Sequence, residues 1–222
     1  MLLFALLFIY FVDQRRYLPA VLSFIMAINS HYLALILLPL ALIFWIRNRD
    51  YRLRLTPSLL AVLIFFLSLL PQVLFDFRHN GQNLTALISF FSQRQSTVNF
   101  KVYKSLPHLW PLHQQLVTRL LAGKNVSLGI IVAALFIIGL IYLCKLRLKH
   151  LGIIIVWYFI GLFCLGLYKQ HIYDHYFGFL FPAPFILIAL MIRYWRYFGY
   201  LILCLIIYNS KKIPFGILRP NS

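Results

Sequence analysis

Two of the chain's few carboxylates stand where they are able to take part in chemistry. The 222 residues include only four acidic side chains, and all four are aspartates. Asp13 and Asp50 lie beside arginines in short basic islands, where a carboxylate is usually a solvated partner for nearby cations. Asp76 and Asp174 instead adjoin apolar segments, where an ionisable group is costly unless it is paired or lines a cavity. These two aspartates mark the stretches in which to look for a site.

Each of these two aspartates belongs to an unusual polar run, DFRHN at 76–80 and YKQHIYDHY at 168–176. Cationic, imidazole and phenol side chains grouped in this way suit an anionic ligand, because they pair with or donate to phosphate oxygens and stack on a sugar ring. The candidate contact residues are Arg78, His79, Lys169, His171, Tyr173 and His175. An alternative accounts for the same residues equally well: Asp76 with Arg78, and Asp174 with Lys169, form ion pairs that anchor helix ends.

Histidines in two places raise the question of a metal. His171 and His175 are four residues apart, a spacing that puts both imidazoles on one face if the segment is helical. No third ligand is in register, so we expect no metal. His31 lies beside Asn29 and Ser30 inside a long apolar stretch, where it is either a polar helix-end residue or a further contact to a substrate. It therefore joins the candidate substrate-binding residues.

These polar runs must be positioned by apolar helices. Hydrophobic residues make up 63% of the chain, aromatic residues make up 18%, and the mean hydropathy is +0.86. A water-soluble surface cannot be built from such a composition. Apolar runs of about 17 to 25 residues are what a helix needs to cross a bilayer, and several occur here between short charged islands. The sequence predicts an all-α fold, a polytopic transmembrane helical bundle with about seven or eight membrane helices.

The net charge of +17 is distributed as in a membrane protein, and not as in a nucleic-acid-binding protein. Eleven of the 21 basic residues lie in four islands between apolar runs, at 15–16, 47–54, 145–149 and 193–196. Such islands mark the cytoplasmic side of a membrane protein. We therefore expect a lipid bilayer as the partner and no nucleic acid, and the sequence leaves protein partners unknown.

The order of apolar and polar segments predicts a topology. Residues 1–12 resemble the end of a helix, residues 17–46 a helical hairpin that turns at 29–31, and residues 57–75 a helix that begins near Pro57. The outer loop 76–125 contains two amphipathic helices, predicted from leucines at helical spacing near 84–91 and 109–120. Further spans are expected at 126–144, 151–168 and 176–193, with a short apolar run at 198–208. Residues 1–210 then form one transmembrane domain, and residues 211–222 form a tail that leads toward an outer domain.

Three stretches together resemble a known family. They are NSHYLALILLPLALIFWI, then PQVLFDFRHNGQN with its Phe-Asp-x-Arg-His core at 75–79, and finally YKQHIYDHYFGFLFPAPFIL. They are similar to the later half of bacterial membrane glycosyltransferases of family 39. That family includes the dolichyl-phosphate-mannose protein mannosyltransferases and the lipid A aminoarabinose transferases. The resemblance covers roughly residues 15–210.

The resemblance implies a GT-C fold in the inner (plasma) membrane, with an active site at the extracytoplasmic face. There a hexose or pentose passes from a polyprenyl-phosphate sugar donor to an acceptor. In this family the catalytic aspartate lies in the first outer loop, where it acts as a base or helps to hold a divalent cation. That loop would precede Met1, so we expect a truncated chain that is inactive by itself. Asp76 and Asp174 are then supporting residues, and no cofactor is assigned to the chain itself.

Two other functions remain open. A polytopic transporter or lipid flippase would place ionisable residues and helix breaks near the bilayer midplane, whereas the ionisable residues here fall mainly at the predicted ends of spans. A membrane scaffold without chemistry would lack the catalytic base, as this chain does. Donor sugar and acceptor do not follow from the sequence, because fold and reaction class do not fix the substrate.

Overall fold

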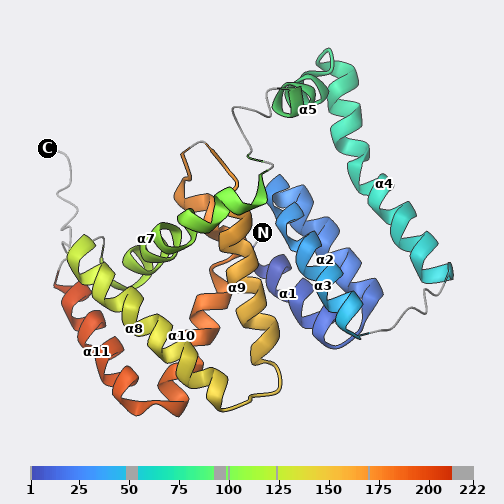
Figure 1. The fold of residues 1–222 in the computed structure, drawn as a ribbon. Helices are drawn as coiled ribbons and strands as arrows, with labels where there is room; N and C mark the ends of the chain where they lie inside the picture. Colours follow the sequence, from blue (N-terminus) through green and yellow to red (C-terminus); the bar gives the residue numbers. More distant parts are fainter. Residues whose placement is uncertain are drawn as a thin grey trace, which may run out of the picture. The chain divides into compact units, whose positions relative to one another are not determined.

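The chain is all-α in its computed structural model, which describes residues 2–48, 55–92, 99, 101–123, 125–169 and 171–211 (Figure 1). It divides into two compact units, each described here by itself. Unit 1 comprises Met1–Leu109 and Gly152–Phe185, and unit 2 comprises Trp110–Leu151 and Ile186–Ser222. Most of the basic island predicted at 47–54, and all of the tail after Lys211, lie outside the described residues. The single domain expected over 1–210 stays a prediction.

Three helices begin unit 1. α1 (Leu2–Asp13) packs against both α2 (Tyr17–Ser30) and α3 (Leu37–Asn48) (Figure 1). The turn between α1 and α2 closes with Arg15 in the left-handed region, at φ 56°. There the Arg16 N–H donates to the Phe11 carbonyl over 2.8 Å, which satisfies a carbonyl of the last turn of α1. The first basic island therefore forms a tight corner between two helices.

The predicted interruption at 29–31 is confirmed. α2 ends at Ser30, His31 is extended with φ −168° and ψ 129°, and the 3-10 helix η1 (Tyr32–Ile36) leads into α3. The His31 N–H donates to the Ala27 carbonyl over 3.0 Å, and the His31 carbonyl accepts from the Ala34 N–H over 3.0 Å. The backbone of the break is therefore paired on both sides, which a non-helical residue beside apolar helices requires.

α4 (Leu55–Arg78) is longer than the sequence predicted. The change of polarity at Asp76 predicted the end of the helix near Phe75, but the helix continues to Arg78. It ends where the backbone turns left-handed at Asn80 and Gly81, with φ 54° and 71°. The Gly81 N–H then donates to the Asp76 carbonyl over 2.8 Å. α5 (Gln82–Ser92) follows at once and coincides with the first predicted amphipathic helix.

The remaining part of unit 1 joins segments far apart in sequence. It contains the 3-10 helices η2 (Val102–His108) and η3 (Asp174–Phe179) and most of α9 (Leu151–Leu165). The buried Ser105 hydroxyl of η2 donates to the Phe163 carbonyl of α9. The Asn99 N–H donates to the Leu167 carbonyl over 2.7 Å. η3 packs against α1 and η1. The segment that follows the break at His31 therefore lies beside the segment that follows α9.

Unit 2 is built from α7 (Leu109–Leu121), α8 (Val126–Lys145), the larger part of α10 (Pro182–Tyr194) and α11 (Arg196–Ser210). α7 coincides with the second predicted amphipathic helix. Small residues on α8 allow close packing: a Cβ at Gly129 would lie 2.7 Å from Thr118 Cβ, and one at Gly139 would lie 2.7 Å from Met191 Sδ. At the other end of the unit, the Asn209 amide donates to the Leu121 carbonyl over 2.8 Å.

The helix lengths bear on the predicted membrane topology. Among the described residues, only α8, with 20 residues, is both long and apolar enough to cross a membrane by itself. Further apolar helices, including α1, α2, α9 and α10, are shorter, with 12 to 15 residues. The all-α class is therefore established, and the seven or eight crossings stay a prediction.

The packing of Gly129 yields a testable prediction for unit 2. Gly129→Ala should lower the free energy of unfolding by about 1–3 kcal/mol, because the added methyl would lie 2.7 Å from Thr118 Cβ and 2.8 Å from its Cγ2, and a branched side chain is stiff at χ1. Gly199→Ala in α11 is the matched control. Its Cβ would meet only Ile192 Cγ2 at 3.4 Å, so replacing glycine within a helix should be neutral or stabilising by up to about 1 kcal/mol. Apparent melting temperatures in detergent measure both changes, and equal temperatures for the two variants would contradict the packing.

Candidate functional site

Aromatic and imidazole rings from two distant segments meet in unit 1. His31, at the break between α2 and η1, lies with its ring centroid 5.9 Å from that of His175 and 6.0 Å from that of Tyr176. Both partners belong to the polar run at 168–176, and both lie in η3. The sequence offered His31 as an isolated candidate, and the fold joins it to the second polar run.

The rings of that run also contact one another. Tyr173 stacks on His175 with centroids 5.7 Å apart and planes at 11°, and meets His171 edge-on at 4.7 Å. Tyr176 makes edge contacts with His175 at 4.4 Å and with Tyr168 at 5.7 Å. We refer to the six residues as the histidine–tyrosine cluster: His31, Tyr168, His171, Tyr173, His175 and Tyr176.

The local sequence explains why these rings face outward. Phe177, Phe179 and Leu180 are fully buried and anchor η3, whereas His171, Tyr173 and His175 are exposed. Residues 171–173 are not helical, and the Tyr176 N–H donates to the Tyr173 carbonyl over 3.0 Å to start the 3-10 turn. Pro182 then takes the first position of α10, where its missing N–H costs nothing. The buried phenylalanines hold the segment, and the polar rings are left free to meet a ligand.

The non-helical backbone changes the meaning of the spacing between His171 and His175. Because His171 lies in extended chain and His175 in η3, the spacing of four does not put them on one helical face as a metal pair. Within the described part of the chain, no three His, Cys, Asp or Glu side chains are grouped so as to hold a metal ion.

The two imidazoles at the centre of the cluster, His31 and His175, interact electrostatically. Burial lowers the pKa of the His31 imidazole from its ordinary value of 6.5, and the charge of the neighbouring His175 lowers that pKa further. Two imidazoles so close repel each other when both are protonated, and an anion between them relieves that repulsion. Lys169, which is exposed beside Tyr168 in sequence, adds a cation to the same loop.

Asp76 has a structural role that the sequence did not predict. Its Oδ1 accepts a hydrogen bond from the Asn83 N–H over 2.7 Å, and its Oδ2 accepts one from the Leu84 N–H over 2.8 Å. These are donors of the first turn of α5, so the carboxylate caps that helix and complements its dipole. Asp76 is therefore a supporting residue that fixes the corner between α4 and α5. Of Asp174, the structure describes only the backbone, which begins η3.

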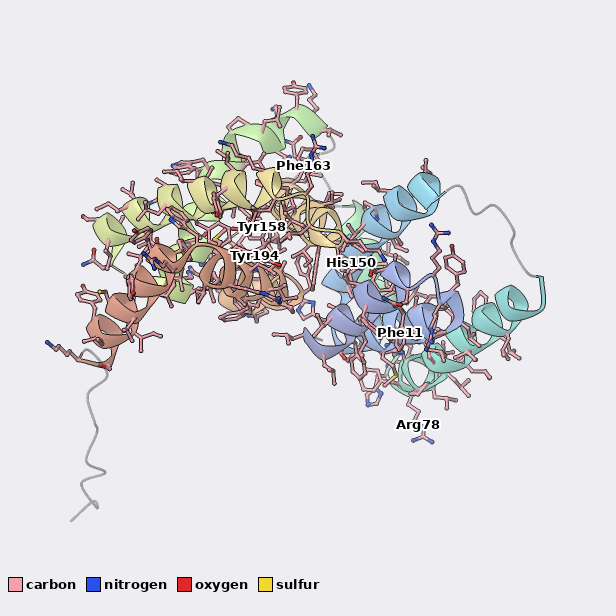
Figure 2. The ribbon with its side chains drawn as sticks, turned by 90° about the horizontal axis from the view of Figure 1, so that it is seen from below. Phe11, Arg78, His150, Tyr158, Phe163 and Tyr194 are labelled. Atoms are coloured by element: carbon pink, nitrogen blue, oxygen red, sulfur yellow. The ribbon has the colours of Figure 1, made fainter. Side chains whose placement is uncertain are left out.

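Arg78 and His79 lie at this corner, apart from the cluster. The Arg78 side chain is exposed and extends away from its helix (Figure 2). The His79 Nδ1 lies 2.8 Å from the Phe75 carbonyl and, as the tautomer that donates to it, leaves Nε2 as an acceptor. Its ring stacks on Phe75 with centroids 3.9 Å apart. Among the described side chains, no hydrogen bond or ring contact joins these two residues to the cluster.

The corner and the cluster nevertheless lie toward the same end of the helices of unit 1. The Gln72 amide donates to the Asn29 side-chain carbonyl over 3.1 Å, which fixes α4 beside the end of α2. Asn29 is two residues before His31, and Asp76 is one helical turn beyond Gln72. The corner between α4 and α5 therefore lies toward the end of α2 that leads into His31. A single site formed by both polar runs stays a prediction.

Sequence reasoning did not select Tyr168 and Tyr176 as contacts, nor His113 as an important residue. The tyrosines were visible in the YKQHIYDHY run, but nothing in the spacing showed which rings would meet His31. His113 is 2% exposed and its Nε2 lies 3.1 Å from the Ala133 carbonyl, so it joins α7 to α8 in unit 2. Burial lowers the pKa of His113, and the bond to Ala133 partly offsets this shift. It is a packing residue.

Comparison with known proteins adds no relative. The chain matches no protein-family model, and no curated protein and no solved structure is similar to it.

The coupling within the cluster can be tested through the titration of His31. His175→Gln should raise the pKa of His31, because one of the three causes that lower this pKa is removed. The shift should be partial, since burial, the largest cause, remains. A histidine NMR titration measures it. His79→Gln is the matched control, because His79 makes no described contact with His31, and an equal shift in both variants would rule out the pair.

The capping role of Asp76 predicts a local effect. Asp76→Ala should cost about 0.5–2 kcal/mol of stability at the start of α5, because two backbone N–H groups lose their acceptor. Amide hydrogen exchange at Asn83 and Leu84 should then become faster, by up to about tenfold for a loss of about 1.4 kcal/mol. Asp76→Asn, which keeps one acceptor oxygen, should change exchange less. Unaltered exchange in the alanine variant would show that the helix does not need this cap.

Proposed function

We propose that the chain is part of a polytopic membrane glycosyltransferase with a GT-C-like fold. It takes a sugar from a polyprenyl phosphate carrier and passes it to an acceptor at the outer face of the plasma membrane. The observation that carries the proposal is the meeting of His31 with His175 and Tyr176, within about 6 Å between ring centroids. A cluster that the fold assembles from two distant segments at the ends of helices is more typical of a binding site than of a chance polar surface.

The chemistry of the cluster suits this donor. Imidazoles are hydrogen-bond donors to phosphate when protonated, and Lys169 is a cation on the same loop. Exposed tyrosine and histidine faces offer platforms on which a sugar ring can lie. Tyr173, which is 53% exposed, presents such a face. A lipid-linked sugar phosphate keeps its chain in the bilayer and its head at the surface, where a cluster at helix ends is able to reach it.

The distribution of charge supports an outer location for the cluster. α2 begins at the Arg15–Arg16 corner and ends at His31, and α9 begins after the 145–149 island and ends before Tyr168. α10 begins after η3 and ends at Arg193 and Tyr194. Each of these helices therefore has a basic corner at one end and the cluster segments at the other. Basic corners face the cytoplasm under the positive-inside rule, which puts the cluster outside.

Exposed apolar side chains support the membrane environment. Along α4, Phe66 is 65% exposed, Leu67 57% and Phe77 82%. Similar fractions recur on α8 and α11, for example 58% at Ile131 and 58% at Ile206. Water is an unfavourable solvent for so much contiguous apolar surface, and hydrocarbon is a favourable one.

The shorter helices fit a bundle that does not cross at full thickness everywhere. Helices of 12 to 15 residues are about 18–23 Å long, less than the hydrocarbon thickness of about 30 Å. Interrupted or short spans are tolerated where their ends are covered by protein or where the bilayer thins locally. We retain about seven or eight membrane helices on this basis, with α8 as a full crossing.

A photoreactive analogue of a polyprenyl phosphate sugar tests the site in membranes that contain the protein. His31→Ala and His175→Ala should each lower labelling of residues 168–176 by about tenfold, since each removes a charged hydrogen bond worth about 1.5–3 kcal/mol. His150→Ala, in the corner between α8 and α9, is the control and should label normally. In a sugar-transfer assay in the same membranes, His175→Ala should lower the rate by about tenfold or more while the protein still inserts.

The outcomes separate the competing functions. Competition by the polyprenyl phosphate sugar but not by the free sugar phosphate supports a lipid-linked donor. Labelling confined to the middle of α8 or α9 would favour a transporter or flippase, because those proteins bind near the midplane. Unchanged labelling and transfer in all cluster variants would remove the site.

A further inference from the structure

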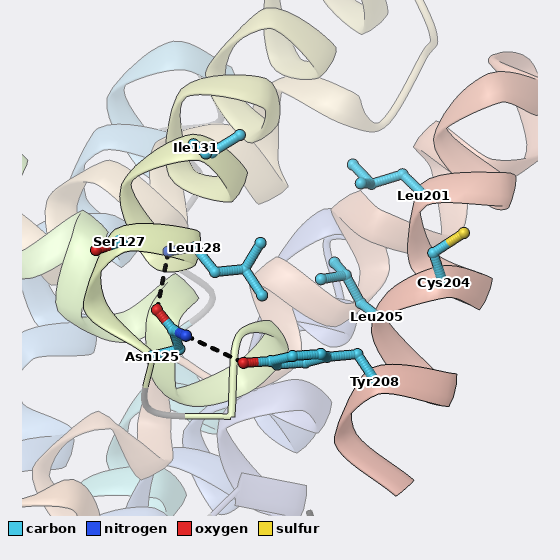
Figure 3. Close-up of a pocket in the computed structure, with 8 residues that line it drawn as sticks. All are labelled: Asn125, Ser127, Leu128, Ile131, Leu201, Cys204, Leu205 and Tyr208. Atoms are coloured by element: carbon cyan, nitrogen blue, oxygen red, sulfur yellow. Dashed lines mark hydrogen bonds between the residues drawn. The ribbon is translucent and has the colours of Figure 1, made fainter. Parts of the chain in front are cut away.

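A groove in unit 2 lies apart from the histidine–tyrosine cluster. It runs between α8 and α11 and has a volume of about 460 Å³ (Figure 3). This volume lies within the range of about 300–1,000 Å³ that is typical of sites for small molecules. Its walls are Leu128 and Ile131 on α8 and Leu201, Cys204 and Leu205 on α11. No charged side chain lines it, so an occupant must be mainly apolar.

One end of the groove is polar. The Asn125 amide donates to the Tyr208 hydroxyl over 3.0 Å, and the Asn125 side-chain carbonyl accepts from the Leu128 N–H over 3.1 Å (Figure 3). The hydroxyl of Ser127 lies at the same end and is exposed. Lys211, also exposed, follows Tyr208 by three residues at the end of α11, a spacing that brings it to the same side of the helix. The groove is therefore amphipathic, with hydroxyls and a cation at one end and hydrocarbon along its length.

The surroundings indicate what covers the groove. The flanking side chains Ile130, Leu203 and Ile207 are 46%, 54% and 49% exposed, so the apolar surface continues on both sides. A packed helix is a poor occupant, because helices in membranes approach one another through small residues. The small residues Gly129 and Gly139 of α8 already face Thr118 and Met191 inside unit 2. The groove itself presents branched aliphatic side chains, which suit a flexible chain.

We propose that this groove binds an anionic phospholipid, with one acyl chain along Leu128, Ile131 and Leu201 and the phosphodiester near Ser127 and Lys211. The inference rests on the membrane location in the proposed function, but not on sugar transfer. The lipid fills the groove between α8 and α11. It serves as a bound structural lipid of unit 2.

Thiol protection tests the proposal on the full chain in detergent. Cys204 lines the groove and is exposed, and Cys144, at the other end of α8, is exposed outside it. Variants that keep only one of these cysteines are treated with a maleimide, with and without phosphatidylglycerol. The lipid should slow the reaction of Cys204 by about fivefold or more and leave Cys144 unchanged, as expected for a site occupied at several times its Kd. Phosphatidylcholine should protect less, and Lys211→Gln should abolish the difference between the two lipids.

A second measurement keeps the test independent of the thiol. Native mass spectrometry should show that Ile131→Trp, which fills the groove, lowers the amount of bound phosphatidylglycerol several-fold. Ile130→Trp, its neighbour outside the groove, should not. Protection of Cys204 that depends on protein concentration instead of lipid would identify a second copy of the chain as the occupant. Protection of Cys204 by polyprenyl phosphate alone would identify the sugar donor as the occupant. Protection by no lipid would show that the groove binds none. Each of these three results overturns the proposal.

The same variants separate failure of the lipid-groove proposal from failure of the glycosyltransferase proposal. Ile131→Trp leaves the cluster untouched, so donor labelling near residues 168–176 should stay normal in this variant. Lipid protection without donor labelling would support the groove alone, and donor labelling without lipid protection would support the cluster alone.

Discussion

The departure of the backbone from the α-helix at His31 is the constraint on which the candidate site depends. A non-helical residue between two apolar helices must have its N–H and carbonyl paired. The His31 N–H donates to the Ala27 carbonyl, and the His31 carbonyl accepts from the Ala34 N–H. This local pairing lets the helix end there and turns the imidazole toward the segment after α9. The segment at 171–173 departs from the helix in the same way. Two interruptions, each tolerable because its neighbours bury apolar anchors, bring together rings that are more than 130 residues apart in sequence.

The few carboxylates of the chain take different roles in this arrangement. Asp76 is held by two N–H groups of α5, so its charge complements a helix terminus. The histidine–tyrosine cluster joins His31 to the histidines and tyrosines of the loop at 168–176. At the opposite ends of the same helices, arginines and lysines form tight corners, two of them with Arg15 and Arg147 at positive φ. The two ends of these helices therefore differ in their chemistry.

In unit 2, side-chain size decides which face of α8 packs closely against its neighbours. Gly129 and Gly139 let α8 approach Thr118 and Met191 closely, so the small residues of the helix are used for internal packing. The face of α8 toward α11 carries leucine and isoleucine instead, and these branched chains keep the helices apart along the groove. His113 is buried in the same unit. The Ala133 carbonyl accepts its Nε2–H, as assigned from the geometry, so that ring nitrogen is not left without a hydrogen-bond partner.

The sequence by itself determined the all-α class, the interruption at 29–31, the helix after the basic island and both amphipathic helices, because each depends on local periodicity or on a local change of polarity. It misplaced the end of α4, since the backbone at Asn80 and Gly81 ends that helix, and the polarity of Asp76 does not. It named His31, Tyr173 and His175 but had no means of joining them. Only the packing of η3 against η1 and α1 brings His31 to His175, and only the fold commits the Asp76 carboxylate to a cap. These contacts depend on distances between segments remote in sequence, which no local pattern encodes.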